Sequence, residues 1–186
     1  EKSRDVVAIK VDGTPRDLET PFEEGTTVEA ITLASEDGLN ILRHSATHVL
    51  AQAVQDVFPD VNLGIGPFIT DGFYYDFGNI AAVTPELLRE LEKRMKRIVK
   101  EGQRFVRREI SEEEATRELA AQPYKLELVT TKGKGAEGAS VEVGGATLTM
   151  YDNVRRDGSV AWKDLCRGPH LPSTKLIGNG FALTKA

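Results

Sequence analysis

The apolar positions of the chain divide it into a β-rich opening, a helical middle and a β-rich end. Apolar runs over residues 6–11 and 26–33, with an Asp12-Gly13 turn and a return over residues 16–18, predict a small antiparallel unit. Such a unit is too short to hold a hydrophobic core of its own. We therefore expect residues 1–34 to be part of a larger domain.

A first helix is predicted over residues 39–57, because its apolar positions recur at helical spacing. Ser35 or Asp37 is available to cap its start. The apolar positions cluster opposite His44 and His48, so the pattern predicts that neither histidine fills the core beside this helix.

Two further helices are indicated by their ends. Thr84 followed by a proline is typical of a helix start, and Gly102 ends the apolar period that follows. Ser111 with Glu114 three residues later is a capping box, which predicts a third helix up to about residue 121.

Strand patterns fill much of the remaining chain. Residues 68–77 hold several aromatic residues around an Asp-Gly turn, which predicts a hairpin in which Tyr75 is the residue whose hydroxyl faces a substrate. Further strands are predicted over residues 124–129, 141–143, 146–151 and 160–165, and a glycine-rich loop covers residues 131–138. Antiparallel strands backing helices make the expected fold class α+β.

Composition and charge narrow the class of protein. The 186 residues are 40% hydrophobic and 28% charged, as in globular proteins. No apolar run approaches the ~20 residues of a membrane span. With a single cysteine there is no internal disulfide, so we expect a cytoplasmic protein without a membrane partner.

The chain has a net charge of −5, but one stretch of it is strongly basic. Residues 93–108 carry eight Lys and Arg side chains and one Glu. The strip either follows a phosphate backbone or is a solvated helix face.

All three histidines and the only cysteine lie in two pentads, His44-Ser-Ala-Thr-His48 and Cys166-Arg-Gly-Pro-His170. Side chains four residues apart on a helix share one face, so His44 and His48 can converge on one point. If the fold brings Cys166 and His170 alongside, the four groups form either a tetrahedral metal set or a hydrolytic site of bases and hydrogen-bonding groups.

Together with the hairpin over residues 65–76 and Asp164 before the second pentad, these motifs resemble the amino-terminal editing domain of bacterial threonyl-tRNA synthetases. The resemblance covers residues 35–186, while residues 1–34 resemble only the second half of the ubiquitin-like TGS domain that precedes it. Alanyl-tRNA synthetase editing domains share the paired pentads, but the hairpin and the Cys-Arg-Gly-Pro-His sequence resemble those of the threonyl branch.

The resemblance implies hydrolysis of serine esterified in error to threonine tRNA. Serine and threonine differ by one methyl group, which a binding pocket discriminates by only ~1–3 kcal/mol, so a second site must remove the wrong product. The implied partners are the 3′ end of tRNA(Thr) bearing serine and the rest of the synthetase in the full-length chain. We expect this fragment to be a monomer that does not itself make threonyl-tRNA.

The resemblance also implies a set of pocket residues. Neutral imidazole suits a base or a water-orienting group, so His44 or His48 takes that role. Gly66 is expected in the wall that excludes the threonine methyl group. The remaining implied pocket residues are Tyr75, Lys125, Asp164, Cys166 and His170.

Chemistry suggests roles for four of them. Lys125 would stabilise negative charge or hold the tRNA 3′ end, and Asp164 would bind the substrate ammonium group or orient a histidine. His170 would relay a proton. For Cys166, we favour a role in organising water over one as a nucleophile.

The same four side chains, His44, His48, Cys166 and His170, are a good zinc set, and the alanyl relatives are understood to use it so. The threonyl branch is taken to work without a catalytic metal, and zinc with four protein ligands would be closed to substrate. We therefore expect no metal to be required. Two alternatives remain: a zinc-stabilised tRNA-binding module without catalysis, and a free-standing deacylase of the alanyl type.

Overall fold

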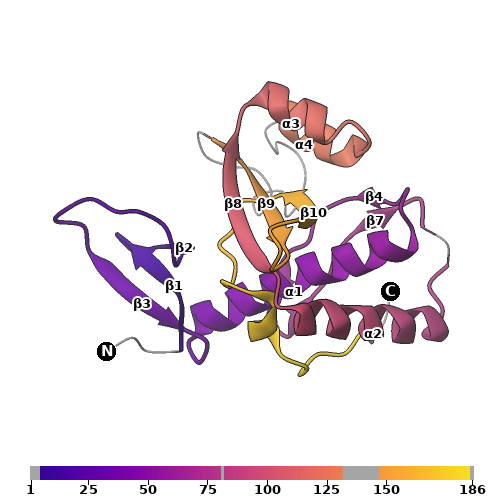
Figure 1. The fold of residues 1–186 in the computed structure, drawn as a ribbon, viewed down its shortest axis with the longest axis horizontal. Coiled ribbons are helices and arrows are strands. Elements are labelled where there is room, and N and C mark those ends of the chain that lie inside the picture. The colour runs from indigo at the N-terminus through magenta and orange to yellow at the C-terminus, as the bar shows by residue number, and fades with distance from the viewer. Residues whose placement is uncertain (1–4, 81, 132–146, 185–186) are drawn as a thin grey trace.

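Helix α1 (Glu36–Val57) runs through the middle of the molecule (Figure 1). The computed structural model describes residues 5–80, 82–131 and 147–184. These ranges contain four α-helices and several small antiparallel sheets, so the predicted α+β class is confirmed. None of the helices described is long and apolar enough to cross a membrane.

The start of α1 is fixed by Ser35, whose Oγ accepts a hydrogen bond of 3.1 Å from the backbone N–H of Gly38. The helix begins at Glu36, three residues before the predicted start. The prediction that the histidines face away from the core is wrong, because every residue from 44 to 54 is buried. Neighbouring elements enclose the helix on all sides over this stretch, where Ala46, Ala51 and Ala53 allow close approach.

The opening strands form one antiparallel sheet in the order β2-β1-β3 (Thr14–Asp17, Val6–Val11 and Val28–Thr32). Val7, Ala8 and Ile31 belong to the same buried cluster as the apolar residues of α1. This sheet therefore shares its hydrophobic core with α1.

Helix α2 (Pro85–Glu101) packs against α1 through its buried apolar residues. Thr84 caps its start and Gly102, at φ 65°, ends it in the left-handed region, as predicted. Its buried residues are Leu91, Met95, Ile98 and Val99. They follow the helical period of the sequence.

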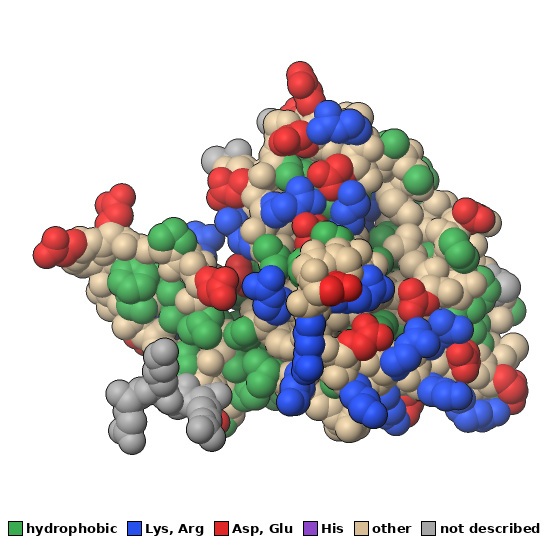
Figure 2. All heavy atoms as spheres, in the orientation of Figure 1, with side chains coloured by type: hydrophobic (Ala, Val, Ile, Leu, Met, Phe, Trp, Pro, Cys, Tyr) green, Lys and Arg blue, Asp and Glu red, His purple; other side chains and the backbone are tan. Residues whose placement is uncertain are grey.

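The basic strip is not one helix face, because α2 ends at Glu101 and the strip continues on strand β8 (Arg104–Ile110). On α2, Arg94 pairs with Glu90 at 2.9 Å and Lys96 with Glu92 at 2.6 Å. Figure 2 shows acidic side chains interspersed with the basic ones over this helix. At least part of the strip is therefore a solvated face with paired charges.

The second half of the chain forms a sheet in the order β10-β9-β8, which we call the late sheet. Its strand β9 covers Leu148–Val154 and its strand β10 covers Val160–Leu165. All its pairs are antiparallel, and Asp164 lies opposite Tyr151. Cys166 follows directly after β10. A short 3-10 helix, η2 (Thr174–Ile177), then packs against α1 and α2.

Two pairs of short strands lie between α1 and α2 in the sequence. The pair β5 and β6 (Phe68–Ile69 and Gly72–Phe73) confirms the predicted aromatic hairpin. The pair β4 and β7 (Asn62–Leu63 and Phe77–Gly78) closes the segment around it. The hairpin packs against α1.

The strand predicted over residues 124–129 is wrong, because the chain forms helix α4 (Pro123–Thr131) there. The run alternates apolar and polar residues, which imitates a strand. The structure instead buries Lys125, Leu128 and Val129, which share one helical face, and Pro123 opens the first turn.

The other elements predicted between residues 111 and 151 were confirmed only in part. Helix α3 (Glu112–Glu118) has the predicted capping box but ends three residues early. The strand predicted over residues 146–151 corresponds to β9, which begins at Leu148. Residues 132–146, which include the predicted strand over 141–143 and nearly all of the predicted loop, lie outside the described residues.

One charged cluster links α3 to the late sheet and yields a stability prediction. Hydrogen bonds from Arg108 and Lys163, at 3.1 and 2.7 Å, lower the pKa of Glu118 from 4.5 to about 2. Because the folded pKa is depressed, these bonds stabilise the fold above pH 4.5, and the stabilisation disappears as the pH falls toward 2. Glu118→Gln should lower the free energy of unfolding by ~1 kcal/mol at pH 7.

Urea denaturation of the wild type and of Glu118→Gln between pH 7 and pH 3 measures this effect. The difference between the two proteins should shrink steadily below pH 4.5. A difference that stays constant over the whole range would show that the charge of Glu118 does not contribute.

Candidate functional site

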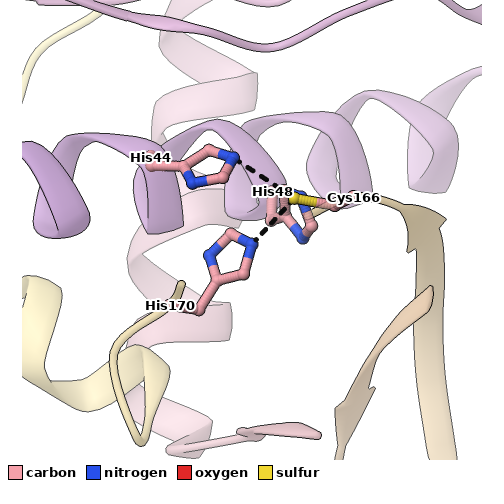
Figure 3. Close-up of side chains that lie close together, drawn as sticks. All are labelled: His44, His48, Cys166 and His170. Atoms are coloured by element: carbon pink, nitrogen blue, oxygen red, sulfur yellow. Dashed lines mark hydrogen bonds between the residues drawn. The ribbon is translucent and has the colours of Figure 1, made fainter. Parts of the chain in front are cut away.

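The two pentads meet at the middle of α1, as Figure 3 shows. The Nε2 atoms of His44 and His170 each lie 3.3 Å from the Sγ of Cys166. The His48 ring lies beside them, with its centroid 4.1 Å from that of His170. All four side chains are between 0% and 3% exposed, so they form one enclosed cluster.

The backbone of the second pentad is tied to its neighbours. The hydroxyl of Thr149 on β9 donates to the carbonyl of Cys166, and the N–H of Cys166 donates to the carbonyl of Thr149 at 3.1 Å. The N–H of Gly168 donates to Cys166 Sγ at 3.3 Å. These bonds hold the thiol at the centre of the cluster.

The opening sheet also reaches the cluster, through Asp17 at the end of β2. Its Oδ1 accepts a 3.0 Å hydrogen bond from the backbone N–H of His170, and its Oδ2 accepts a 2.5 Å bond from the Tyr151 hydroxyl. The Tyr151 ring in turn meets the His170 ring edge-on, with centroids 4.6 Å apart. Gly168, at φ 71°, has no room for a side chain because a Cβ there would overlap the Tyr151 hydroxyl.

A second buried group adjoins the histidines. Asp164 accepts a 2.5 Å hydrogen bond from the Tyr75 hydroxyl, and it pairs with the ammonium group of Lys125 at 3.1 Å. Burial raises the pKa of the Asp164 carboxyl, and the positive charge of Lys125 opposes that rise. The backbone N–H of Leu165 also donates to Asp164, at 2.8 Å. Both carboxylate oxygens therefore have partners.

Gly66 lies between Tyr75 and α1. A Cβ at this position would overlap the Tyr75 ring and would lie 3.0 Å from the Thr47 hydroxyl. Only glycine leaves the tyrosine where its hydroxyl meets Asp164. The predicted wall residue therefore helps to hold Tyr75 in place.

Burial also determines the charge of the imidazoles. Loss of solvation lowers the pKa of His44 to about 4 and lowers those of His48 and His170 well below 6.5. The positive charge of Lys125 lowers the pKa of His44 and His48 further. All three rings are therefore neutral at pH 7, each with one N–H and one lone pair.

His48 differs from the other two histidines in its contacts. Among the described residues, neither of its ring nitrogens has a hydrogen-bond partner, although the side chain is 1% exposed. A buried polar group without a partner is costly, and such groups often mark a place where water, an ion or a substrate binds. His48 is therefore the member of the cluster best able to contact a small polar molecule.

The cluster could hold a metal ion. Ligand atoms of His44, His48, Cys166 and His170 all lie within 4.8 Å of one another. A tetrahedral zinc ion would set its nitrogen and sulfur ligands about 3.6 Å apart, close to the 3.3 Å found between Cys166 Sγ and two of the imidazoles. The donor set thus fits zinc.

A separate hollow of about 560 Å³ lies on the outer side of the late sheet. Its charged lining residues already pair with one another, as Arg108 does with Asp152 and Glu118. It offers no group for chemistry. The enclosed cluster on α1 remains the candidate site.

The structure brings every residue predicted for the site into one connected region. His44, His48, Cys166 and His170 form the cluster, and Tyr75, Lys125 and Asp164 form the adjoining group, with Gly66 packed against it. Their individual roles stay predictions. Sequence reasoning missed Ser45, Asp17 and Tyr151, and of these only Ser45 had a signal, since it lies inside a pentad.

Comparison with known proteins agrees with the motifs. Residues 141–185 match the threonyl and alanyl tRNA synthetase second additional domain. The chain is 73% identical over 182 residues to a threonine–tRNA ligase of Cutibacterium acnes. It is 54% identical over 187 residues to that of Pseudarthrobacter chlorophenolicus and 56% identical over 178 residues to that of Thermobifida fusca.

These alignments cover 98%, 98% and 94% of this chain but only 27%, 28% and 27% of the relatives. The chain therefore spans about a quarter of the length of the proteins that it matches.

The packing of Gly66 leads to a prediction. Gly66→Ala should lower the free energy of unfolding by about 1–3 kcal/mol, because the new methyl group displaces the Tyr75 ring. Gly180→Ala is the matched control, since a Cβ there meets nothing within 4 Å. Urea denaturation of both variants provides the measurement. Equal stabilities would show that Tyr75 moves aside without cost.

Proposed function

Since the chain is a segment of the threonine–tRNA ligase family, corresponding to the N-terminal region of its members, we propose that it hydrolyses serine esterified in error to threonine tRNA. The substrate is the ester between the carboxyl group of serine and a ribose hydroxyl at the tRNA 3′ end. Its hydrolysis would restore free tRNA and protect the fidelity of translation.

One observation carries the proposal: the buried, neutral His48 ring has both nitrogens free of partners among the described residues, beside two more neutral imidazoles. Ester hydrolysis needs a group that accepts a proton from water as the water attacks the carbonyl carbon. A neutral imidazole with an unused lone pair can do this. His48 is therefore the preferred base, and His44 the alternative.

The reaction then proceeds by transfer of one proton. Water adds to the ester carbonyl while its proton moves to the imidazole, and the carbonyl oxygen becomes negatively charged. When the bond between the carbonyl carbon and the ribose oxygen breaks, the imidazole returns the proton to that oxygen. The ammonium group of Lys125, fully buried nearby, provides positive charge for the oxyanion or for the tRNA end.

For Asp164, the geometry favours orientation over substrate binding. Both its oxygens already accept hydrogen bonds, from Tyr75 on one side and from Leu165 and Lys125 on the other. Binding a substrate ammonium group would require one of these partners to leave. We therefore infer that Asp164 holds Lys125 and Tyr75 in position.

Selection against threonine would come from the rigid wall formed by Gly66 and Tyr75. The two are packed so closely that an atom added at Gly66 would overlap the Tyr75 ring. A wall of this kind resists the expansion needed for an extra methyl group. It supports the assignment of the site to serine.

The buried ligand set favours a second candidate, a zinc-stabilised tRNA-binding module without catalysis. A zinc ion held by His44, His48, Cys166 and His170 would be coordinatively closed, so it would supply stability and no activated water. We prefer metal-free hydrolysis because it leaves His48 available. A free-standing deacylase of the alanyl type would instead prefer alanine esters.

The proposal predicts selective hydrolysis. The chain should release serine from seryl-tRNA(Thr) and leave threonyl-tRNA(Thr) intact. His48→Ala should slow the release by about 10²–10⁴-fold, because the base is lost. The assay measures the decay of each radiolabelled ester under single-turnover conditions, with alanyl-tRNA(Ala) as a further substrate.

Thr116→Ala is the control for that assay, because the one hydrogen bond of its exposed hydroxyl within the described part of the chain goes to the Glu112 carbonyl on α3. It should match the wild type. Equal decay of the seryl ester with wild type and His48→Ala would exclude His48 as the base. Decay of neither threonine tRNA ester would leave only a binding role, and preference for the alanine ester would support the alanyl type.

A second prediction concerns metal. Chelation followed by dialysis should leave the rate of seryl-ester hydrolysis unchanged, and the metal content should be far below one ion per chain. Atomic absorption and the ester assay on the same sample provide both numbers. A rate that falls on chelation and returns with added zinc would overturn metal-free hydrolysis.

A further inference from the structure

The hydroxyl of Ser45 joins the two pentads, and the hydrolytic mechanism proposed above does not use it. Ser45 is fully buried on α1, directly after His44. Its Oγ lies 2.8 Å from the carbonyl oxygen of Ile41, 3.0 Å from the N–H of Leu171 and 3.1 Å from Nδ1 of His170. One small group therefore makes three polar contacts.

The three contacts can be satisfied in one way only. A serine hydroxyl has one hydrogen to donate and two lone pairs that accept. The Ile41 carbonyl can only accept, so it takes the hydroxyl hydrogen. The Leu171 N–H can only donate, so it uses one lone pair. The remaining contact is satisfied only if Nδ1 of His170 carries a hydrogen and donates it to the second lone pair.

This arrangement fixes the other nitrogen of His170. A neutral imidazole carries one ring hydrogen, so a hydrogen on Nδ1 leaves Nε2 with a lone pair. That lone pair faces the Sγ of Cys166, 3.3 Å away. The ring cannot easily turn, because Phe105 stacks on it with centroids 5.0 Å apart and the Tyr151 ring packs against it edge-on at 4.6 Å.

We propose that Ser45 is a positioning residue that holds His170 in the Nδ1-protonated tautomer, so that Nε2 presents a lone pair to the centre of the cluster. The opposite tautomer would place an N–H there and would turn an acceptor into a donor. Only an acceptor can take a proton from water or from the thiol. The tautomer itself does not depend on the proposed hydrolysis, whereas its effect on rate does.

The tautomer is directly measurable. The chain has three histidines, all in the cluster, so long-range ¹H–¹⁵N spectra of the chelator-treated, reduced protein contain three imidazole patterns. Substitution of each histidine in turn assigns the three imidazole patterns to His44, His48 and His170. His170 should show a protonated Nδ1 and an unprotonated Nε2. A wild-type His170 with its hydrogen on Nε2 would overturn the proposal.

Ser45→Ala removes the acceptor, so the population with hydrogen on Nε2 should rise by about fivefold or more, as expected from the loss of one neutral hydrogen bond. Thr116→Ala, which also removes a helical hydroxyl, should leave the His170 pattern unchanged. An unchanged pattern in Ser45→Ala would refute the role of Ser45. If Ser45→Ala does not fold, Ser45→Cys provides a weaker acceptor of similar volume, and the wild-type spectrum still decides the tautomer.

The ester assay adds the functional consequence. If seryl-tRNA(Thr) is hydrolysed as proposed, Ser45→Ala should lower kcat by about 10–100-fold with little change in KM, as for other residues that orient a site imidazole. An unchanged kcat beside a shifted tautomer would show that His170 does not act in the reaction. If the wild type hydrolyses nothing, the proposed function fails while the spectra still test Ser45.

Discussion

Burial of three imidazoles and a thiol beside one helix is the constraint on which the surrounding structure depends. Polar groups removed from water are destabilising unless they gain hydrogen bonds, and ionised ones are more so. The protein responds by keeping the histidines neutral and by giving most of their polar atoms partners. Ser45 and Asp17 serve His170, while Thr149 and Gly168 fix Cys166. His48 alone is left without a partner in the described part of the cluster, which is why it carries the proposed chemistry.

The adjoining ion pair follows the same physical rule with charged groups. Lys125 and Asp164 are both fully buried, and each would be strongly destabilising alone. Their pairing, with the Tyr75 hydroxyl and the Leu165 N–H on the carboxylate, makes burial tolerable. Burial lowers the pKa of His44 and His48, and the positive charge of Lys125 lowers it further. The site therefore combines a fixed positive charge with uncharged bases, which suits attack by water on an ester.

Local sequence signals predicted much of this fold. Caps at Ser35, Thr84 and Ser111, and the stop at Gly102, depend on hydrogen bonds within a few residues, and all four are found. The convergence of the pentads followed from helical spacing together with the rarity of histidine and cysteine in the chain. Such features can be inferred because their causes lie close together in the sequence.

The failures have causes that lie far apart in the sequence. Residues 124–129 alternate like a strand, but the packing of Leu128 and Val129 against the late sheet requires a helix. The histidine face of α1 appears polar in sequence, yet other elements cover it completely. Asp17 is 153 residues from its partner His170, so no local sequence pattern predicts their hydrogen bond. These features depend on tertiary packing, which overrides local preference.

The bond between Asp17 and the second pentad has a consequence for how such proteins vary. Asp17, Tyr151 and Gly168 form a matched set: the acid accepts from the phenol and from the pentad backbone, and the glycine leaves room for the phenol. A change at one position therefore disturbs the contacts that the other two make. A chimaera that joined the opening sheet of one relative to the later segments of a distant one would therefore keep an ordered pentad only if both parents carried compatible members of this set.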